Sequence, residues 1–392
     1  MGIRRDMDLQ FLRDLTAVPG PYATVYLDDS HDTEDADRLH ELRWAEARRQ
    51  LEGAGADATT LEALDAAAAT APRVGGRAGR VLVAAGTGPP GERVRLDRTL
   101  PEPPATPSAT WAPVPDLLPM LVEQPEHVPA VAVRVDETGG EVFRSQPGNA
   151  PAEVEQVRGD ELVHKVRGGG WSHLAMQERV EESWRRNAAD LAQRVDKLVA
   201  ATGARVVVVT GDARSRSRLI DALGSRAAEL AVQVERSGGP VDVDELTAAV
   251  DEAARDVVVA DRRALVDRYE KATGRADGLA VEGVDGVLAA LRSGAVDTVL
   301  LDTVFLDGGV RRDRTVCVAD EPTHVATTPD QLRALGSEPT GEAAVDAALT
   351  RAAAASGAAL VPFPPDGDGR PTGPSMADGV AALLRYPVPS GA

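Results

Sequence analysis

The feature that most constrains the fold is the run of four valines in Arg205-Val-Val-Val-Val-Thr210, near the middle of the chain. A short run that is apolar at every position, rather than at alternate ones, is typical of a strand buried on both faces, as in a parallel sheet. Helical periodicity lies on either side of it, from about 174 to 200 and from about 215 to 224. A doubly covered strand between two helices predicts a layered α/β fold.

Strand-like and helical segments continue to alternate along all 392 residues, which predicts the fold class α/β. The length exceeds what one core usually supports, so we expect three domains, each a mixed or parallel sheet with packed helices. Their predicted bounds are 1–125, including a proline-rich linker at 101–115, then 126–255 and 256–392. The expected strands are 22–27, 80–85, 91–97, 130–135, 141–145, 205–210, 231–234, 278–282, 298–302, 316–318 and 359–363. The expected helices are 8–15, 36–52, 59–71, 116–122, 174–200, 215–224, 241–251, 256–271, 284–293 and 341–355.

Three successive glycines precede the long helical stretch that begins near 174. Glycine has no side chain to fix the backbone, so we expect a mobile tip over 164–173. Basic side chains suit phosphate contacts and a tryptophan suits stacking on a base, which together favour RNA as the ligand. A flexible surface loop with an incidental tryptophan is the alternative. The candidate RNA-binding residues are His164, Lys165, Arg167, Gly168, Gly169, Gly170, Trp171, His173, Arg179, Arg185 and Arg186.

The net charge of −19 argues against a protein that coats nucleic acids generally. The charge is unevenly distributed, however. Between 158 and 226 there are 13 Lys and Arg against 9 Asp and Glu, a net charge of +4, so the rest of the chain carries −23. A basic middle in an acidic chain predicts an oriented contact with something anionic.

The single cysteine, Cys317, cannot form an intrachain disulfide, as expected in a reducing compartment. No apolar run approaches the roughly 18 residues of a membrane span. Arg4 and Arg5 are not followed by the apolar segment of a signal peptide. We therefore expect a cytoplasmic protein.

The sequence contains no HExxH, paired CxxC, Walker or G-x-S-x-G motif, so we expect no catalytic residue, no metal site and no cofactor. The acidic segment from 28 to 37 is crowded rather than spaced as a ligand set. This favours a solvated lead-in to the following helix over a metal site. Cys317 is interpreted as a small core residue rather than a nucleophile.

Several segments resemble motifs of the archaeo-eukaryotic peptide-chain release factor and Pelota superfamily. Residues 167–169 (Arg-Gly-Gly) and the helix after them look like the GGQ-bearing loop and helix of its central domain. Residues 291–300 look like the Ala-Leu-x-x-Gly-Ala-Val-x-Thr-Leu-Leu element of its C-terminal domain, and 378–386 resemble the Leu-Arg-Tyr ending of that domain. The strand at 22–27 and the helix with Arg-Trp at 43–44 resemble its bacterial branch, which includes a ribosome hibernation factor.

This resemblance implies an RNase H-like central domain and a C-terminal α/β/α sandwich. Two departures bear on activity. No glutamine stands at the tip, where the family associates that residue with placing the attacking water, and the nearest is Gln177 in the helix. The first domain also lacks an Asn-Ile-Lys-Ser stop-codon element. We therefore expect neither efficient hydrolysis nor codon-dependent termination, and we favour a protein that is not an enzyme.

For function, the resemblance implies a ribosome-binding translation factor of the hibernation or stalled-ribosome class. It would occupy the A site, with the tip near the peptidyl-transferase centre of the 23S rRNA. Its C-terminal domain would meet a ribosomal protein or a translational GTPase such as EF-Tu. The alternative is a peptidyl-tRNA hydrolase or tRNA-cleaving rescue factor, with His164 or His173 as acid/base. A scaffold that does not touch ribosomes is a third interpretation, which leaves the basic middle unexplained.

Overall fold

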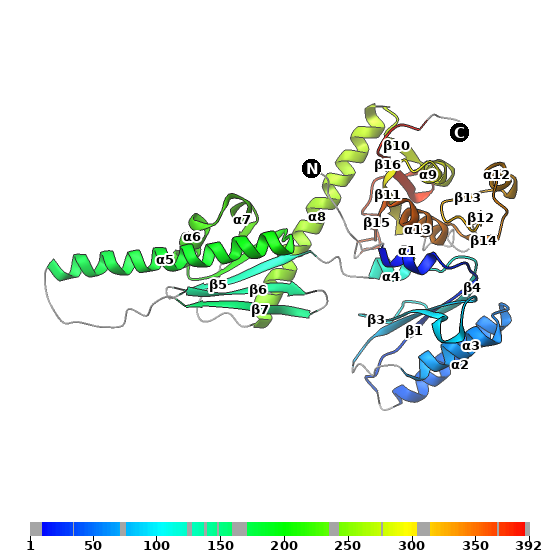
Figure 1. Ribbon diagram of the computed structural model, residues 1–392, viewed down its shortest axis with the longest axis horizontal. Coiled ribbons are helices and arrows are strands. Elements are labelled where there is room, and N and C mark those ends of the chain that lie inside the picture. The colour runs from blue at the N-terminus through cyan, green and yellow to red at the C-terminus, as the bar shows by residue number, and fades with distance from the viewer. Residues whose placement is uncertain are drawn as a thin grey trace. The chain divides into compact units, whose positions relative to one another are not determined.

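The protein is a mixed α/β protein, as the sequence predicted, and its described residues form four sheets (Figure 1). The computed structural model describes residues 10–33, 35–70, 76–123, 128–136, 139–146, 149–158, 171–234, 243–275, 277–303, 314–366 and 368–388. The chain forms two compact units. Unit 1 consists of Met1–Gln124 and Leu265–Ala392, and unit 2 of Pro125–Ala264. The first and last parts of the chain thus share one unit, and the division into three domains stays a prediction.

The first sheet of unit 1 is antiparallel, and helices α2 (Ala36–Gly53) and α3 (Ala58–Ala69) cover one of its faces. Alternate residues of strand β1 (Tyr22–Asp28) face opposite cores. Val25 and Leu27 pack under these helices, whereas Tyr22 and Tyr26 enter the main core of unit 1. Burial on both faces explains why this strand is mostly apolar. Its strands, in sheet order, are β3 (Val94–Leu100), β2 (Gly79–Ala85), β1 (Tyr22–Asp28) and β4 (Ser108–Ala112).

The second sheet of unit 1 is built from the C-terminal part of the chain. Its strands, in order, are β10 (Ala280–Glu282), β16 (Val380–Leu384), β11 (Val296–Asp302) and β15 (Ala359–Phe363). Leu265 and Tyr269, in the second half of helix α8 (Val243–Arg275), pack on one face. On the other face the main core also receives residues of α1 (Gln10–Thr16), α4 (Leu118–Glu123), α9 (Gly283–Arg292) and α13 (Val345–Ser356). One apolar core therefore joins the first and last parts of the chain.

A third, small sheet completes unit 1. Its strands are β13 (Val325–Ala326), β12 (Thr315–Val318) and β14 (Gly341–Ala344), and helix α12 (Pro329–Ala334) packs beside them. Cys317 is buried here with Leu332, which agrees with its interpretation as a core residue. Two single-turn 3-10 helices, η1 (Pro90–Glu92) and η3 (Ala377–Gly379), lead into β3 and β16.

Unit 2 is a five-stranded mixed sheet between two helical layers. The valine run forms its strand β8: Val207 and Val209 face the core under helices α5, α6 and α7, while Val206 and Val208 face the first half of α8. The prediction of a strand covered on both faces is confirmed. The sheet order is β7 (Asn149–Arg158), β6 (Gly139–Gln146), β5 (Ala130–Asp136), β8 (Val206–Gly211) and β9 (Ala231–Gln233). The helices of the first layer are α5 (Trp171–Thr202), α6 (Ala213–Ala222) and α7 (Ser225–Glu229).

The structure differs from the sequence-based expectation at several segments, among them the following four. The proline-rich segment 101–115 contains strand β4, because Ser108–Ala112 holds no proline and pairs with β1. The helix expected from 341 begins only at Val345, since Gly341–Ala344 pairs with β12. The two helices expected at 241–251 and 256–271 are one continuous helix, α8. Strand β7 was not expected at all.

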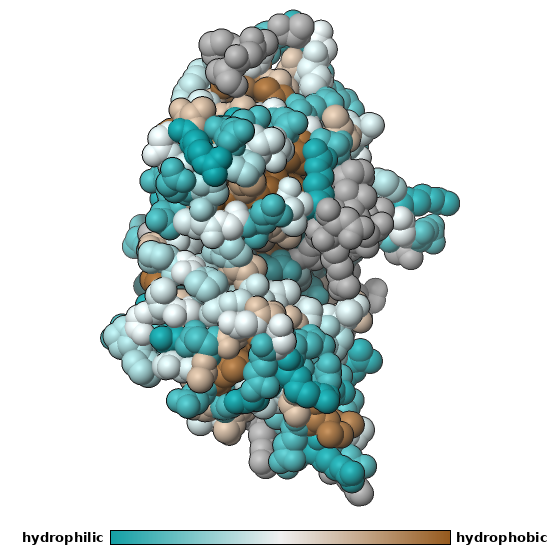
Figure 2. All heavy atoms as spheres, turned by 90° about the vertical axis from the view of Figure 1, so that its right-hand side faces the viewer, coloured by the Kyte–Doolittle hydropathy of each residue, from teal (hydrophilic) through white to brown (hydrophobic). Residues whose placement is uncertain are grey.

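The surface face drawn in Figure 2 is mostly hydrophilic, with hydrophobic residues in separate small patches. Scattered apolar residues of this kind are normal on protein surfaces. Among the helices that the structure describes, none is long and apolar enough to cross a membrane. The exposed large hydrophobic residues in the described segments are Leu39, Leu42, Val232, Val259, Leu335 and Tyr386.

Candidate functional site

The predicted RNA-binding residues lie at the start of helix α5 and in the segment before it. Residues 164–170, which hold six of the eleven, are outside the described part of the chain, so their role stays a prediction. Trp171, His173 and Arg179 belong to the first turns of α5, but their side chains are also outside it. The two remaining residues, Arg185 and Arg186, are both exposed on α5.

Helix α5 is long enough to hold its first turns away from the sheet. It has 32 residues, which corresponds to a length of about 48 Å. Its described core contacts begin near Ala188 and recur at Leu191, Val195 and Val199, the spacing of one helical face. The amino-terminal part of α5 extends beyond the strands of its sheet (Figure 1). The glycine segment is therefore joined to a helical arm whose core contacts lie at its far end.

The described solvent face of α5 is charged. Arg185 lies 3.4 Å from Glu182, with 77% of its side chain exposed. Such an exposed pair contributes little to stability, which leaves the arginine available for another anion. Arg186 and Lys197 are exposed and are eleven residues apart, or about three turns, so they share one side of the helix opposite the core.

The turn between β8 and α6 is built for close packing rather than for ligand binding. Gly211 has φ of 133°, and a Cβ atom there would lie 1.9 Å from the carbonyl oxygen of Val135. Asp212 caps α6, where its Oδ1 atom accepts hydrogen bonds from the backbone N–H groups of Arg214 at 3.1 Å and Ser215 at 3.0 Å. Burial alone would raise the pKa of Asp212, but the hydrogen bonds to its carboxylate have the larger effect, so its pKa lies below the ordinary value.

The arginines of α6 divide into structural and exposed ones. Arg216 is only 4% exposed, and its guanidinium donates to the carbonyl oxygens of Gly211 at 2.9 Å and Val234 at 3.2 Å. It therefore ties the turn to the end of β9. Arg214 is exposed and adds positive charge at the beginning of the helix.

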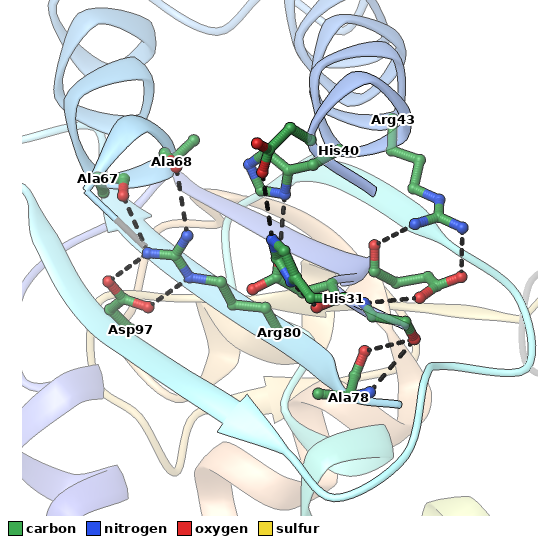
Figure 3. A network of polar contacts seen from close by, with 12 residues as sticks. His31, His40, Arg43, Ala67, Ala68, Ala78, Arg80 and Asp97 are labelled. Carbon is green, nitrogen blue, oxygen red and sulfur yellow. Dashed lines mark hydrogen bonds and ion pairs between the residues drawn. The ribbon is translucent and has the colours of Figure 1, made fainter. Parts of the chain in front are cut away.

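A polar network that sequence reasoning missed lies in unit 1, between the first sheet and helices α2 and α3 (Figure 3). At one end of it, Arg80 of β2 is 1% exposed. Its guanidinium donates to both carboxylate oxygens of Asp97, at 2.8 and 2.7 Å, and to the carbonyl oxygens of Ala67 at 2.9 Å and Ala68 at 3.5 Å. These carbonyls end helix α3, so one side chain fastens that helix to strands β2 and β3.

His40 of α2 forms the centre of the same network. Its Nδ1 atom lies 2.7 Å from Oδ1 of Asp29, a carboxylate that is only 5% exposed. The contact with Asp29 raises the pKa of His40, against the opposing effect of partial burial. The ring of His31 lies 6.5 Å from that of His40, and its Nδ1 atom is 2.9 Å from the carbonyl oxygen of Asp29.

The segment 28–37 is thus not simply a solvated lead-in, because Asp29 is buried against α2. The signal present in the sequence was two histidines, His31 and His40, beside a cluster of aspartates. No group of three or more His, Cys, Asp or Glu able to hold a metal ion occurs among the described residues.

Comparison with known proteins places these features in a family. Residues 129–275, which include α5 and most of unit 2, match the model of "Bacterial archaeo-eukaryotic release factor family 2". The chain is 33% identical over 384 residues to the uncharacterized protein Rv2629 of Mycobacterium tuberculosis strain H37Rv, with 96% of each chain covered.

Two solved structures are also similar to this chain. A model of ribosome-bound archaeal Pelota and ABCE1 is 15% identical, covers 97% of this chain and 94% of its own, and gives a TM-score of 0.42. The S. cerevisiae translation termination-like factor Dom34 is 10% identical, with 80% and 82% covered and a TM-score of 0.39. The resemblance deduced from the glycine segment and the C-terminal motifs is confirmed by the family match and the mycobacterial relative, and the chain belongs to bacterial archaeo-eukaryotic release factor family 2.

Proposed function

We propose that this protein is a ribosome-binding translation factor of the hibernation or stalled-ribosome class. It occupies the A site and carries the segment 164–173 toward the peptidyl-transferase centre of the 23S rRNA. Lys165, Arg167, Arg179, Arg185 and Arg186 contact rRNA phosphates, and Trp171 stacks on a base. Such a factor acts in the cytoplasm, in stressed or stationary cells.

The observation that carries this proposal is helix α5. A segment with three glycines and flanking cations directly precedes a 32-residue helix whose amino-terminal part extends beyond its sheet. An arm of this kind suits a probe that must enter a deep, RNA-lined cavity. The missing glutamine at the tip supports occupancy of that cavity over hydrolysis within it.

The finer fold prediction fits the same proposal. In unit 2, the three antiparallel strands β5, β6 and β7 are followed by β8 and β9, each parallel to its neighbour on the β5 side. This order supports the RNase H-like assignment of the central domain. In the C-terminal part, helices on both faces of the β11 sheet support the α/β/α sandwich.

The acidity of the remaining chain favours a protein partner for the C-terminal domain. Residues 256–392 contain 13 Lys and Arg against 20 Asp and Glu, a net charge of −7, which opposes contact with bare RNA. We propose that the C-terminal domain meets a translational GTPase such as EF-Tu or a basic ribosomal protein. Crosslinking on purified ribosomes, read out by mass spectrometry, distinguishes these two partners.

The test of the central proposal is co-sedimentation with 70S ribosomes across a salt series. We expect binding by the wild-type protein and much weaker binding by a Lys165→Glu/Arg167→Glu variant. Arg185→Glu/Arg186→Glu should also bind more weakly, with the salt slope reduced by about 2 if both arginines contact phosphates. The matched control is Arg49→Glu/Arg77→Glu, which makes the same charge change at exposed positions in unit 1, outside the C-terminal domain.

Three outcomes are informative. Absence of the wild-type protein from ribosomes at every salt concentration would refute the proposal. Equal loss of binding in the control variant would show that the weaker binding reflects net charge and not contacts made by these residues. Turnover of peptidyl-tRNA that disappears in His164→Ala or His173→Ala would instead identify the hydrolase named as the alternative.

A further inference from the structure

The ion pair of His40 joins two separate parts of unit 1. On one side of the ring lies the buried carboxylate of Asp29, in the loop after β1, at 2.7 Å from Nδ1. His40 itself belongs to α2. The loop and helix α2 are therefore held together at one imidazole.

The contact between the ring and Asp29 is an ion pair. A carboxylate that is only 5% exposed needs a compensating cation close by. The protonated ring of His40, with Nδ1 at 2.7 Å from that carboxylate, supplies this cation. Loss of the proton leaves the buried charge of Asp29 without its counter-ion, which is a destabilising state.

We propose that protonated His40 is a pH-sensitive latch that holds the loop after β1 against helix α2. The same loop is also hydrogen-bonded to the residues just before β2, at one end of the first sheet. The backbone N–H groups of Asp29 and His31 donate to the carbonyl oxygens of Ala78 at 2.9 Å and Gly76 at 2.8 Å, which lead into β2. Release of the latch therefore loosens this edge of the N-terminal sheet.

The other charged groups around the ring form ion pairs with other residues, so Asp29 is the carboxylate that pairs with His40. From β2, Arg80 lowers the proton affinity of His40, but its charge is balanced by Asp97 of β3. From the loop, Asp28 is paired with Arg43 of α2 at 2.6 Å.

Two further ionisable groups lie close by. The Nε2 atom of His31 is 3.8 Å from Asp37, which is largely exposed at the beginning of α2. From α3, the backbone carbonyl of Ala68 acts in the same direction as Asp29 and raises the pKa of His40. Among the described groups, Asp29 is thus the buried charge that faces His40 directly.

The direction of the pH effect follows from this geometry. The pKa of His40 is raised in the folded protein by Asp29, so folding favours the protonated ring. Its contribution to stability is fully present below the ordinary histidine pKa, near 6.5. That contribution is lost as the pH rises through the raised pKa of the folded state. The latch is closed in mildly acidic conditions and opens toward alkaline pH.

The experiment is a pH series on the full-length protein with two readouts. The ring protons of His40, followed by NMR, should titrate above the ordinary histidine value, and Asp29→Asn should move this midpoint down. In parallel, the urea midpoint of unit 1 should fall as the pH is raised across that titration. The fall should be absent in His40→Asn and unchanged in the control His324→Asn, a histidine of the same unit that contacts the hydroxyl of Ser337.

A local readout keeps the proposal testable if a variant folds poorly. Amide exchange in the wild-type protein should show protection at Asp29 and His31 that decreases as His40 loses its proton. A His40 midpoint at or below the ordinary value would overturn the proposal. So would a urea midpoint that falls with pH equally in His40→Asn and in the wild-type protein.

Discussion

Replacement of Arg80 by methionine should remove one of the main ties between helix α3 and the first sheet. Methionine keeps the length of the apolar stem but none of the donors, so the packing of the stem is retained. The change deletes two hydrogen bonds to Asp97 and two contacts with the carbonyl oxygens of Ala67 and Ala68. Because Arg80 is 1% exposed, water does not readily replace these donors.

The expected loss is about 3 kcal/mol. Breaking a buried ion pair by removing one partner costs about 3–5 kcal/mol. The lower end applies here, because the side chain of Asp97 is 38% exposed and regains water once Arg80 is gone. For a folding unit of this size, about 3 kcal/mol corresponds to a fall in Tm of roughly 6–12 °C.

The assay is urea unfolding at constant pH, with calorimetry as a second measure. The matched control is Arg77→Met: Arg77 is 69% exposed and lies 3.5 Å from an exposed glutamate, so the loss should stay within about 0.5 kcal/mol. Asp97→Asn should cost at least as much as Arg80→Met, because it leaves the buried charge of Arg80 without its counter-ion. If Arg80→Met costs under about 1 kcal/mol, or no more than the control, the inferred fastening of α3 is refuted.

Three further changes test separate parts of the fold by urea unfolding. Gly211→Ala should destabilise unit 2 by about 2–4 kcal/mol, because its φ is 133° and a Cβ atom would meet the carbonyl of Val135; near-neutral stability would contradict this. Tyr26→Phe should cost about 1–2 kcal/mol, since the buried hydroxyl donates to Asp116 at 2.9 Å; no loss would mean that the bond is not formed. Asp57→Ala should cost about 1 kcal/mol at pH 7 through the lost cap of α3. Burial alone would raise the pKa of Asp57, but hydrogen bonds from Thr60 have the larger effect, so the pKa lies below its ordinary value. The cost of Asp57→Ala should therefore vanish as the pH falls through that lowered pKa.

The parts of the fold that the sequence predicted are those with a local pattern. The four valines before Thr210 required burial on both faces, and β8 has it. The periodic stretch from 174 to 200 became α5, extended by a few residues at each end. In both cases the physical cause, apolar spacing along one segment, is contained within that segment.

The parts that escaped prediction depend on partners distant in sequence. Strand β4 exists because residues 108–112 find β1, some 85 positions earlier, and the prolines on either side suggested a linker instead. Gly341–Ala344 has a composition that suits a helix, yet pairing with β12 makes it a strand. Tertiary contacts override local propensity in such cases, because the propensity differences are below about 1 kcal/mol per residue.

The two candidate sites differ in whether a local pattern or a distant contact defines them. The glycine segment was identified from composition and from motifs read in order, and its role rests on those motifs and on the arm behind it. For the His40 cluster, the local pattern of the sequence was not sufficient. Its residues were visible as an acidic stretch beside two histidines, but the decisive fact is the burial of Asp29, whose backbone N–H donates to Ala78, 49 positions later. Closure of that distant strand pairing turns a stretch of solvated charge into a carboxylate that requires a cation, and His40 is the cation placed to meet it.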